Sequence, residues 1–223
     1  MAIYSDLKLL FPKPGYNISY HRGYVSINET GKNVKVKEIK WEKSDFQYID
    51  KDIIKDLSSF FQKTNSSDIF LKECDGIIFF EENGKKYVFL CELKSSFDTS
   101  DLYYAMHQII SSYIKLNMIL HLLVNYTRTD YHFKAFIACL PPNKSYIPTL
   151  HKQLFLPSGS KYRDEADFSS ELYVNKKVRI KPTDCEKLKG LNLGNNCLFN
   201  ELTFHYIEVP DSGSINLDIH NYI

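Results

Sequence analysis

The chain has 223 residues, of which 43% are hydrophobic and 25% are charged, and its net charge at pH 7 is +1. This composition is typical of an ordinary globular protein and excludes a disordered or fibrous chain. No apolar run approaches the ~20 residues of a membrane span, and the first residues lack the basic and long apolar segments of a signal peptide.

The cysteines and the balanced charge limit the kinds of site that we expect. The five cysteines are an odd number without close C-x-x-C spacing, which favours free thiols in a reducing compartment over disulfides or a zinc site. We therefore expect a cytoplasmic protein without a membrane partner. A nucleic-acid partner would require lysines and arginines to gather on one surface, because the whole chain is almost neutral.

Residues 1–49 predict short β elements that precede the main core. Residues 16–27 are expected to form a hairpin that turns at residues 21–23. Residues 34–41 are expected to form an edge strand, since their interleaved lysines would protect an exposed sheet edge. Glu29 is expected in an exposed loop.

Residues 50–62 predict the first long helix. Asp50 is a suitable N-cap because its side chain can accept a hydrogen bond from an unpaired helix N–H. Apolar residues at helical spacing form the expected buried stripe, namely Ile49, Ile53, Leu57 and Phe60.

The stretch from Glu73 to Ser96 carries the strongest local signal. Two apolar runs flank Asn83-Gly84, a dipeptide that favours a type I′ turn because both residues tolerate a positive φ. A two-residue turn there fixes how the two strands pair. The expected pairs are Glu82 with Lys85, Phe80 with Tyr87, Ile78 with Phe89, Asp75 with Glu92, and Glu73 with Lys94.

This register places Glu73, Asp75, Glu92 and Lys94 on one face of the hairpin, because side chains alternate along a strand. Directly opposed residues lie ~5 Å apart at Cβ, so Asp75 and Glu92 would repel each other. A hard cation such as Mg²⁺, which prefers carboxylate, water and phosphate oxygens, is one way to relieve this repulsion. The other is a cross-strand ion pair between Glu73 and Lys94, with the remaining charges in water.

Both faces of the hairpin are apolar, which predicts a central strand pair covered on both sides. The face of the charges carries Ile77, Phe79, Val88 and Leu90. The opposite face carries Ile78, Phe80, Phe89, Cys91 and Leu93.

Residues 101–123 predict a long, largely buried helix, because apolar residues cover most of its circumference. Residues 131–140 predict a buried strand, which the helical crossover would add parallel to the sheet. Among the few polar residues of the helix, Gln108 is a weak candidate site residue, and His107 is expected to be an ordinary core or surface histidine.

The C-terminal part predicts less regular structure. Residues 143–170 are expected to be rich in loops, residues 171–181 to form a hairpin, and residues 203–209 to form a last strand. The hairpin would carry the best phosphate-contacting candidates, although a solvated hairpin explains them equally well. These candidates are Lys176, Lys177, Arg179 and Lys181.

Asp75, followed after the hairpin by Glu92-Leu93-Lys94, resembles the motif of the PD-(D/E)xK nuclease superfamily, with Cys74 in place of the family's proline. The resemblance covers roughly residues 50–140. It implies an α/β (α+β) restriction-endonuclease-like core with a mixed central sheet flanked by helices. Residues 1–49 and 141–223 would be β-rich additions to a single domain over residues 1–223.

The resemblance also implies a site. Asp75, Glu92 and the backbone carbonyl of Leu93 would hold Mg²⁺ or Mn²⁺, and Lys94 would position water or neutralise charge at phosphorus. Glu73 would be an additional acid or the resting partner of Lys94. The first helix supplies another acid in many members, and the candidates are Asp50, Asp52 and Asp56.

RecB-like members of the superfamily carry a Q-x-x-x-Y pattern on the helix after the lysine. Gln108 is similar to that glutamine, but Ser112 stands where the tyrosine is expected, and Tyr113 falls one residue late. The pattern is therefore broken in this chain.

The function that the resemblance implies is a metal-dependent endonuclease, with double-stranded DNA as the leading substrate. A homodimer or higher homo-oligomer is expected, since one such centre cuts one strand at a time. A bacterial or phage restriction, defence or repair setting follows from the same analogy. Two other classes stay open: an inactive nuclease-like module that binds nucleic acid or protein, and a structural protein in which Lys94 only pairs with Glu73.

Overall fold

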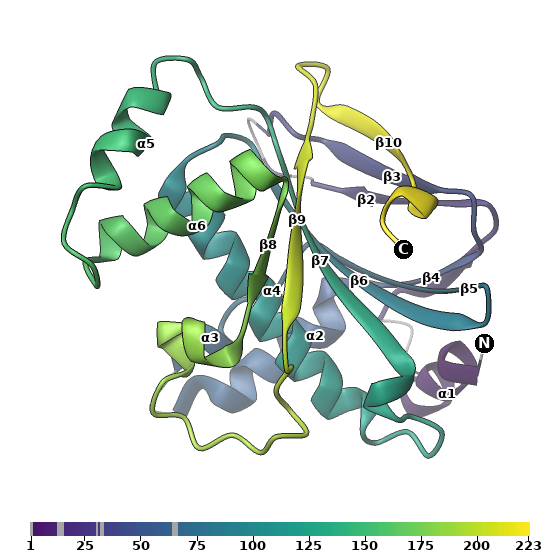
Figure 1. Cartoon of the computed structure of the whole chain (residues 1–223). Coiled ribbons are helices and arrows are strands. Elements are labelled where there is room, and N and C mark those ends of the chain that lie inside the picture. Colours follow the sequence, from purple (N-terminus) through teal and green to yellow (C-terminus); the bar gives the residue numbers. More distant parts are fainter. Residues whose placement is uncertain (1, 13–15, 30, 32–33, 64–66) are drawn as a thin grey trace.

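The computed structural model describes residues 2–12, 16–29, 31, 34–63 and 67–223. A seven-stranded mixed sheet lies at its centre, with helices on one face and a three-stranded sheet on the other (Figure 1). The strand order is β1 (Ile18–His21), β4 (Phe46–Ile49), β5 (Gly76–Glu82), β6 (Lys85–Lys94), β7 (Tyr131–Cys139), β9 (Leu202–Glu208) and β8 (Lys177–Ile180). Strands β6, β7 and β9 are parallel, and the other neighbours are antiparallel.

The hairpin at the centre of this sheet has the predicted register over Gly76–Glu82, whereas the two outermost predicted pairs, Asp75 with Glu92 and Glu73 with Lys94, lie outside the ladder. The ladder between β5 and β6 runs from Glu82 opposite Lys85 to Gly76 opposite Cys91. Asn83 and Gly84 form the turn with φ values of 51° and 73°, as a type I′ turn requires. The two apolar faces are also confirmed, because one packs in the core under the helices and the other under the smaller sheet.

The smaller sheet corrects two predictions about the N-terminal part. Strand β3 (Glu38–Glu42) lies between β2 (Tyr24–Asn28) and β10 (Ser214–Asp218), so it is a central strand and not an edge. Its parallel partner β10 comes from the far end of the chain, which local pattern could not reveal. The expected hairpin over residues 16–27 is also wrong, because β1 pairs with β4 and β2 pairs with β3.

The helices α1 (Ala2–Leu10), α2 (Lys51–Phe60), α3 (Ser67–Phe70), α4 (Thr99–Leu120), α5 (Ile147–Gln153) and α6 (Lys161–Asn175) complete the regular structure. Short 3-10 turns cover Phe61–Lys63, Arg128–Asp130, Pro182–Asp184, Glu186–Leu188 and Ile219–Asn221. The two long helices predicted from sequence are confirmed as α2 and α4. Asp50 caps α2 by accepting from the N–H of Asp52, whereas Phe60 is exposed and Phe61 takes the buried place.

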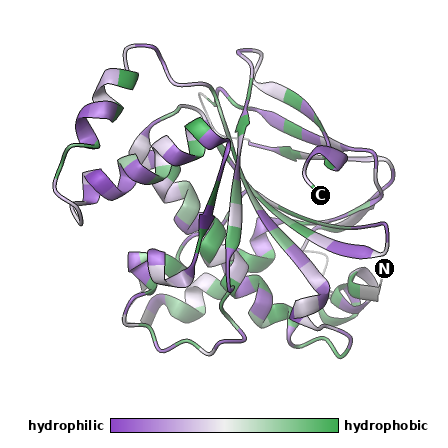
Figure 2. Cartoon of the chain, in the orientation of Figure 1, coloured by the Kyte–Doolittle hydropathy of each residue, from purple (hydrophilic) through white to green (hydrophobic). Residues whose placement is uncertain are grey.

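Helix α6 replaces the predicted loop and hairpin. Ser160 caps it by accepting from the N–H of Arg163, and Lys176 ends it in the left-handed region with φ 57°. Its buried side chains are few and are separated by charged residues, so the sequence lacks the strong apolar spacing that would have predicted this helix. Figure 2 accordingly shows α5 and much of α6 in hydrophilic colours, in contrast to the central strands.

Helix α4 connects β6 to β7, and this crossover makes the two strands parallel, as predicted. Its side chains are buried around almost the whole circumference. Within the described ranges, no helix combines the length and the apolar character that crossing a bilayer demands.

The contact between the two sheets predicts the effect of one substitution. A Cβ added to Gly76 would lie 2.7 Å from the fully buried Ile27 side chain of β2. Gly76→Ala should therefore lower the free energy of unfolding by about 1–3 kcal/mol, the usual cost of overpacking. Urea denaturation followed by circular dichroism measures this change.

Gly194→Ala is the matched control, because its added Cβ would meet nothing within 4 Å. It should change the stability by less than about 0.5 kcal/mol. Equal stability of the Gly76→Ala and Gly194→Ala variants would contradict the close sheet packing.

Candidate active site

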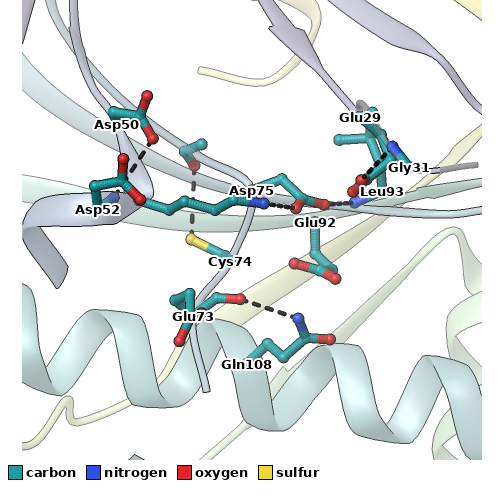
Figure 3. Close-up of polar contacts among 12 residues, drawn as sticks. Glu29, Gly31, Asp50, Asp52, Glu73, Cys74, Asp75, Glu92, Leu93 and Gln108 are labelled. Carbon is teal, nitrogen blue, oxygen red and sulfur yellow. Dashed lines mark hydrogen bonds and ion pairs between the residues drawn. The ribbon is translucent and has the colours of Figure 1, made fainter. Parts of the chain in front are cut away.

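Asp75 and Glu92 lie together at one end of the central hairpin, and both are nearly inaccessible to water. Asp75 immediately precedes β5 and is 7% exposed, and Glu92 near the end of β6 is 2% exposed. Figure 3 shows the two side chains close together, with Gln108 of α4 facing them. The expected meeting of these two acids is therefore present in the structure.

The backbone at Asp75 departs from the regular ladder. Its N–H donates to the carbonyl of Cys91 at 3.0 Å, one residue off the hairpin register. Its Oδ2 accepts a hydrogen bond from the N–H of Leu93 at 2.9 Å. Both bonds tie Asp75 to β6, so the carboxylate is fixed relative to Glu92.

Lys51 is a site residue that the sequence analysis missed. Its Nζ lies 3.1 Å from Asp75 Oδ1, and its side chain is 40% exposed. Burial lowers the pKa of Lys51, but the charges of Asp75, Glu29 and Glu92 outweigh it and raise the pKa overall. Glu29 thus acts on this site electrostatically, although the sequence suggested only an exposed loop. Neither position belongs to a local motif that would have revealed it.

Glu92 is the least satisfied charged group of the site. Its Oε1 lies 2.7 Å from the Nζ of Lys94, whereas its buried Oε2 has no hydrogen-bond partner among the described residues. Burial, and next the charge of Asp75, raise the pKa of Glu92 to about 8. The carboxyl therefore holds a proton at neutral pH unless another cation approaches it.

A chain of hydrogen bonds connects Lys94 to the segment before Asp75. The Nζ of Lys94 donates to Gln108 Oε1 at 2.6 Å, and Gln108 Nε2 donates to the carbonyl of Glu73 at 2.9 Å. Gln108 therefore contacts the site. The ion pair of Lys94 is formed with Glu92, and Glu73 contributes its main-chain carbonyl to the network.

The polar residues of α4 hold the segment that leads into Asp75. Ser112 Oγ accepts from the N–H of Cys74 at 2.8 Å, at the position where the RecB-like pattern has tyrosine. The fully buried Lys115 donates to the carbonyl of Lys72 at 2.6 Å, to that of Phe70 at 3.1 Å, and to Ser58 Oγ at 2.9 Å. These bonds leave the Lys115 ammonium fully used as a structural donor.

The other candidates lie outside this cluster. Asp50 caps α2, and Asp56 accepts a hydrogen bond from the Tyr16 hydroxyl. The proposed phosphate-contacting segment is at the far edge strand β8, where Lys176 lies 3.0 Å from Glu208 and Arg179 lies 3.5 Å from Glu201. Lys177 and Lys181 belong to that same segment, so the four cations are separated from Asp75 by several strands.

The residues present fit a divalent cation at one place. Asp75 and Glu92 supply hard oxygen donors, as Mg²⁺ and Mn²⁺ prefer, and the orphaned Glu92 Oε2 has a lone-pair site to offer. No group of three or more His, Cys, Asp or Glu side chains suited to a metal exists among the residues that the structure places. A cation here would therefore need backbone carbonyl, water or substrate oxygens as its other ligands.

Comparison of the chain with protein-family models, with curated proteins and with solved structures finds no match. The likeness to the PD-(D/E)xK superfamily thus depends on the motif residues alone.

The raised pKa of Glu92 predicts a pH dependence of stability. The unfolded carboxyl ionises near pH 4.5, whereas the folded one keeps its proton to about pH 8. Between these values the native state binds more protons, so this group makes the free energy of unfolding fall as the pH rises. Glu92→Gln removes the ionisation and should be more stable than the parent at pH 8 by on the order of 2 kcal/mol, with a smaller difference at pH 5.

Urea denaturation at pH 5, 6.5 and 8 measures the difference in the free energy of unfolding between the parent and the variant. The contributions of the other titrating groups cancel in this difference. Glu201→Gln, at a partly exposed surface ion pair with Arg179, is the control and should show no such trend. A difference between parent and Glu92→Gln that is the same at all three pH values would refute the raised pKa.

Proposed function

We propose that the chain is a metal-dependent nuclease that hydrolyses phosphodiester bonds in nucleic acid at the Asp75–Glu92–Lys94 site. The observation that supports this most is the buried Glu92 carboxylate, which shares its space with Asp75 and keeps one oxygen without a hydrogen bond. A protein that needed only a structural ion pair has no reason to keep two acids there, since each buried charge costs several kcal/mol.

Asp75 and Glu92 would hold Mg²⁺ or Mn²⁺. When bound, such a cation supplies a Lewis acid for a phosphate oxygen and lowers the pKa of a coordinated water. The protein's part is to keep both carboxylates in place, and Asp75 is already fixed by the N–H of Leu93. The Leu93 carbonyl, on the same residue, is the proposed additional ligand.

Lys94 would stabilise the charge that develops on the phosphate. Its ammonium has three N–H donors, and Glu92 and Gln108 accept two of them. The third donor is available to a non-bridging oxygen or to the attacking water. Because two acceptors fix the ammonium before substrate arrives, little reorganisation is needed during the reaction.

One observation favours a second candidate, a module that binds without cutting. Each acid already has a lysine partner, Lys51 for Asp75 and Lys94 for Glu92, so neither acid depends on a metal for a positively charged neighbour. Thermal unfolding with and without 5–10 mM Mn²⁺ or Mg²⁺, a concentration on the order of those that stabilise weak metal sites, separates the two candidates. A nuclease should be stabilised by the metal and its Asp75→Asn variant should not, whereas a binding module should not respond.

Substitutions in the site predict the loss of cleavage. Asp75→Asn removes the charge that would hold the cation and should abolish hydrolysis. Lys94→Met removes the donor to the phosphate and should slow hydrolysis by on the order of 100-fold or more. Cleavage of supercoiled plasmid, linear duplex, single-stranded DNA and RNA is measured with Mg²⁺, with Mn²⁺ and with EDTA.

Glu201→Gln again serves as the control, because Glu201 pairs with Arg179 at the surface. This variant should cut as fast as the parent. Circular dichroism spectra must match that of the parent, so that a lost fold is not mistaken for a lost site. Undiminished cleavage by Asp75→Asn would remove the proposed site.

A further inference from the structure

A cavity of about 720 Å³ lies at the first turns of α4. Its lining includes Lys72, Tyr103, Tyr104, His107, Lys161 and Lys187. Helix α4, the first turns of α6 and the turn at Glu186–Leu188 all contribute residues to this lining. Its volume lies in the range that encloses a small organic group such as a nucleoside.

Tyr104 joins this cavity to the carboxylate site. The Nζ of Lys72 lies 3.8 Å from the centre of its ring, and the Nζ of Lys94 lies 5.1 Å from it. Two ammonium groups therefore stand over one partly exposed aromatic ring, and one of them is the lysine bound to Glu92. A ligand that touches Tyr104 is consequently within reach of both the cavity and the site.

Lys72 is a cation that is available to bind an anion. It forms no ion pair with any residue that the structure describes, although it is half-buried. Burial first, and then the positive charges of Lys187 and Lys94, lower the pKa of Lys72. A phosphate between Lys72 and Lys94 would relieve the repulsion between these two ammonium groups.

His107 is part of the cavity wall and carries an unsatisfied buried polar atom. The residue is 5% exposed, and its Nε2 has no hydrogen-bond partner within the described part of the chain. Its ring packs edge-on against Tyr103, 4.7 Å away. A small rotation of this ring would let the neutral imidazole nitrogen donate to, or accept from, the polar edge of a bound ring.

The charges inside the cavity cancel. The lining contains three lysines, Lys72, Lys161 and Lys187, and three acids, Asp101, Glu165 and Glu186. Two of these lysines are also paired, with Lys161 3.7 Å from Glu165 and Lys187 3.0 Å from Asp68. The interior therefore suits a neutral aromatic group with polar edges. A negatively charged phosphate attached to that group would bind beside Tyr104, where Lys72 and Lys94 lie.

We propose that this cavity receives an unpaired nucleobase of the strand whose phosphate lies at Lys72 and Lys94, so that the substrate is single-stranded nucleic acid. The inference rests on the proposed nuclease function and narrows its substrate class. A base in a duplex is stacked and paired, and must leave the helix before an enclosed pocket can bind it. Aromatic walls that accept a base without reading its sequence are typical of single-strand binding.

Binding is tested apart from cleavage, in EDTA, by fluorescence anisotropy of labelled 12-nucleotide single-stranded DNA, single-stranded RNA and the DNA duplex. Single strands should bind at least about 10-fold more tightly than the duplex. Tyr104→Ala should weaken single-strand binding by about 5- to 100-fold, as expected for loss of one base-stacking ring. Tyr104→Phe, which keeps the ring, should bind within about 3-fold of the parent, because most stacking energy is retained.

Tyr24→Ala is the matched control. Tyr24 is a similarly exposed tyrosine on β2 that also lies under a lysine, with the Nζ of Lys40 4.3 Å from the ring centre. It lies outside the cavity lining and should leave binding unchanged. Tighter binding of the duplex, or equal binding by Tyr104→Ala and Tyr24→Ala, would overturn the proposal. The DNA and RNA arms identify which sugar the strand carries.

Cleavage with Mg²⁺ on the same oligonucleotides separates this inference from the proposed function. Ring-dependent binding of single strands without any cleavage supports the cavity and contradicts the nuclease. Cleavage of duplex at the rate of single strands, unaffected by Tyr104→Ala, supports the nuclease and contradicts the cavity. Preferential cleavage of single strands that is lost in Tyr104→Ala supports both.

Discussion

Asp75 and Glu92 bring two acidic groups into a nearly water-free space, and the surrounding structure supplies the partners that such groups require when they ionise. Each buried ion loses several kcal/mol of hydration, so it needs partners at short range. Lys51 reaches Asp75 from the first turn of α2, and Lys94 reaches Glu92 from the same strand. Helix α2 and the central hairpin are therefore connected through the site itself.

Helix α4 provides the second layer of support. Gln108 bonds both Lys94 and the carbonyl of Glu73, Ser112 bonds the N–H of Cys74, and Lys115 bonds the carbonyl of Lys72. The segment before Asp75 has no strand partner of its own in the ladder, which begins at Gly76. Polar side chains on an otherwise apolar helix replace that ladder, and this explains why they stand among buried neighbours.

The parts of the fold that sequence predicted are those specified by local interactions. The Asn83-Gly84 turn sets the register by itself, and the apolar spacing in α2 and α4 is strong within each segment. The central place of β3 depends on β10, and α6 depends on burial against α4, so both are decided by contacts between distant segments. Lys51 and Glu29 were missed for the same reason, because only the tertiary fold brings their charges to Asp75.

The balance of charge at the site links metal and substrate in the proposed reaction. Once Glu92 is ionised, the charges of Asp75, Glu92, Lys51 and Lys94 sum to zero, so a divalent cation alone would leave two excess positive charges at the site. A phosphodiester carries one negative charge, and Lys51, whose side chain is 40% exposed, can turn its ammonium toward water when the cation binds Asp75. Cation and phosphate should thus bind more tightly together than either does alone, since each removes part of the electrostatic cost of the other. The buried Glu92, raised in pKa by burial and by Asp75, is the group through which this coupling acts, because its ionised form is the one that a cation would select.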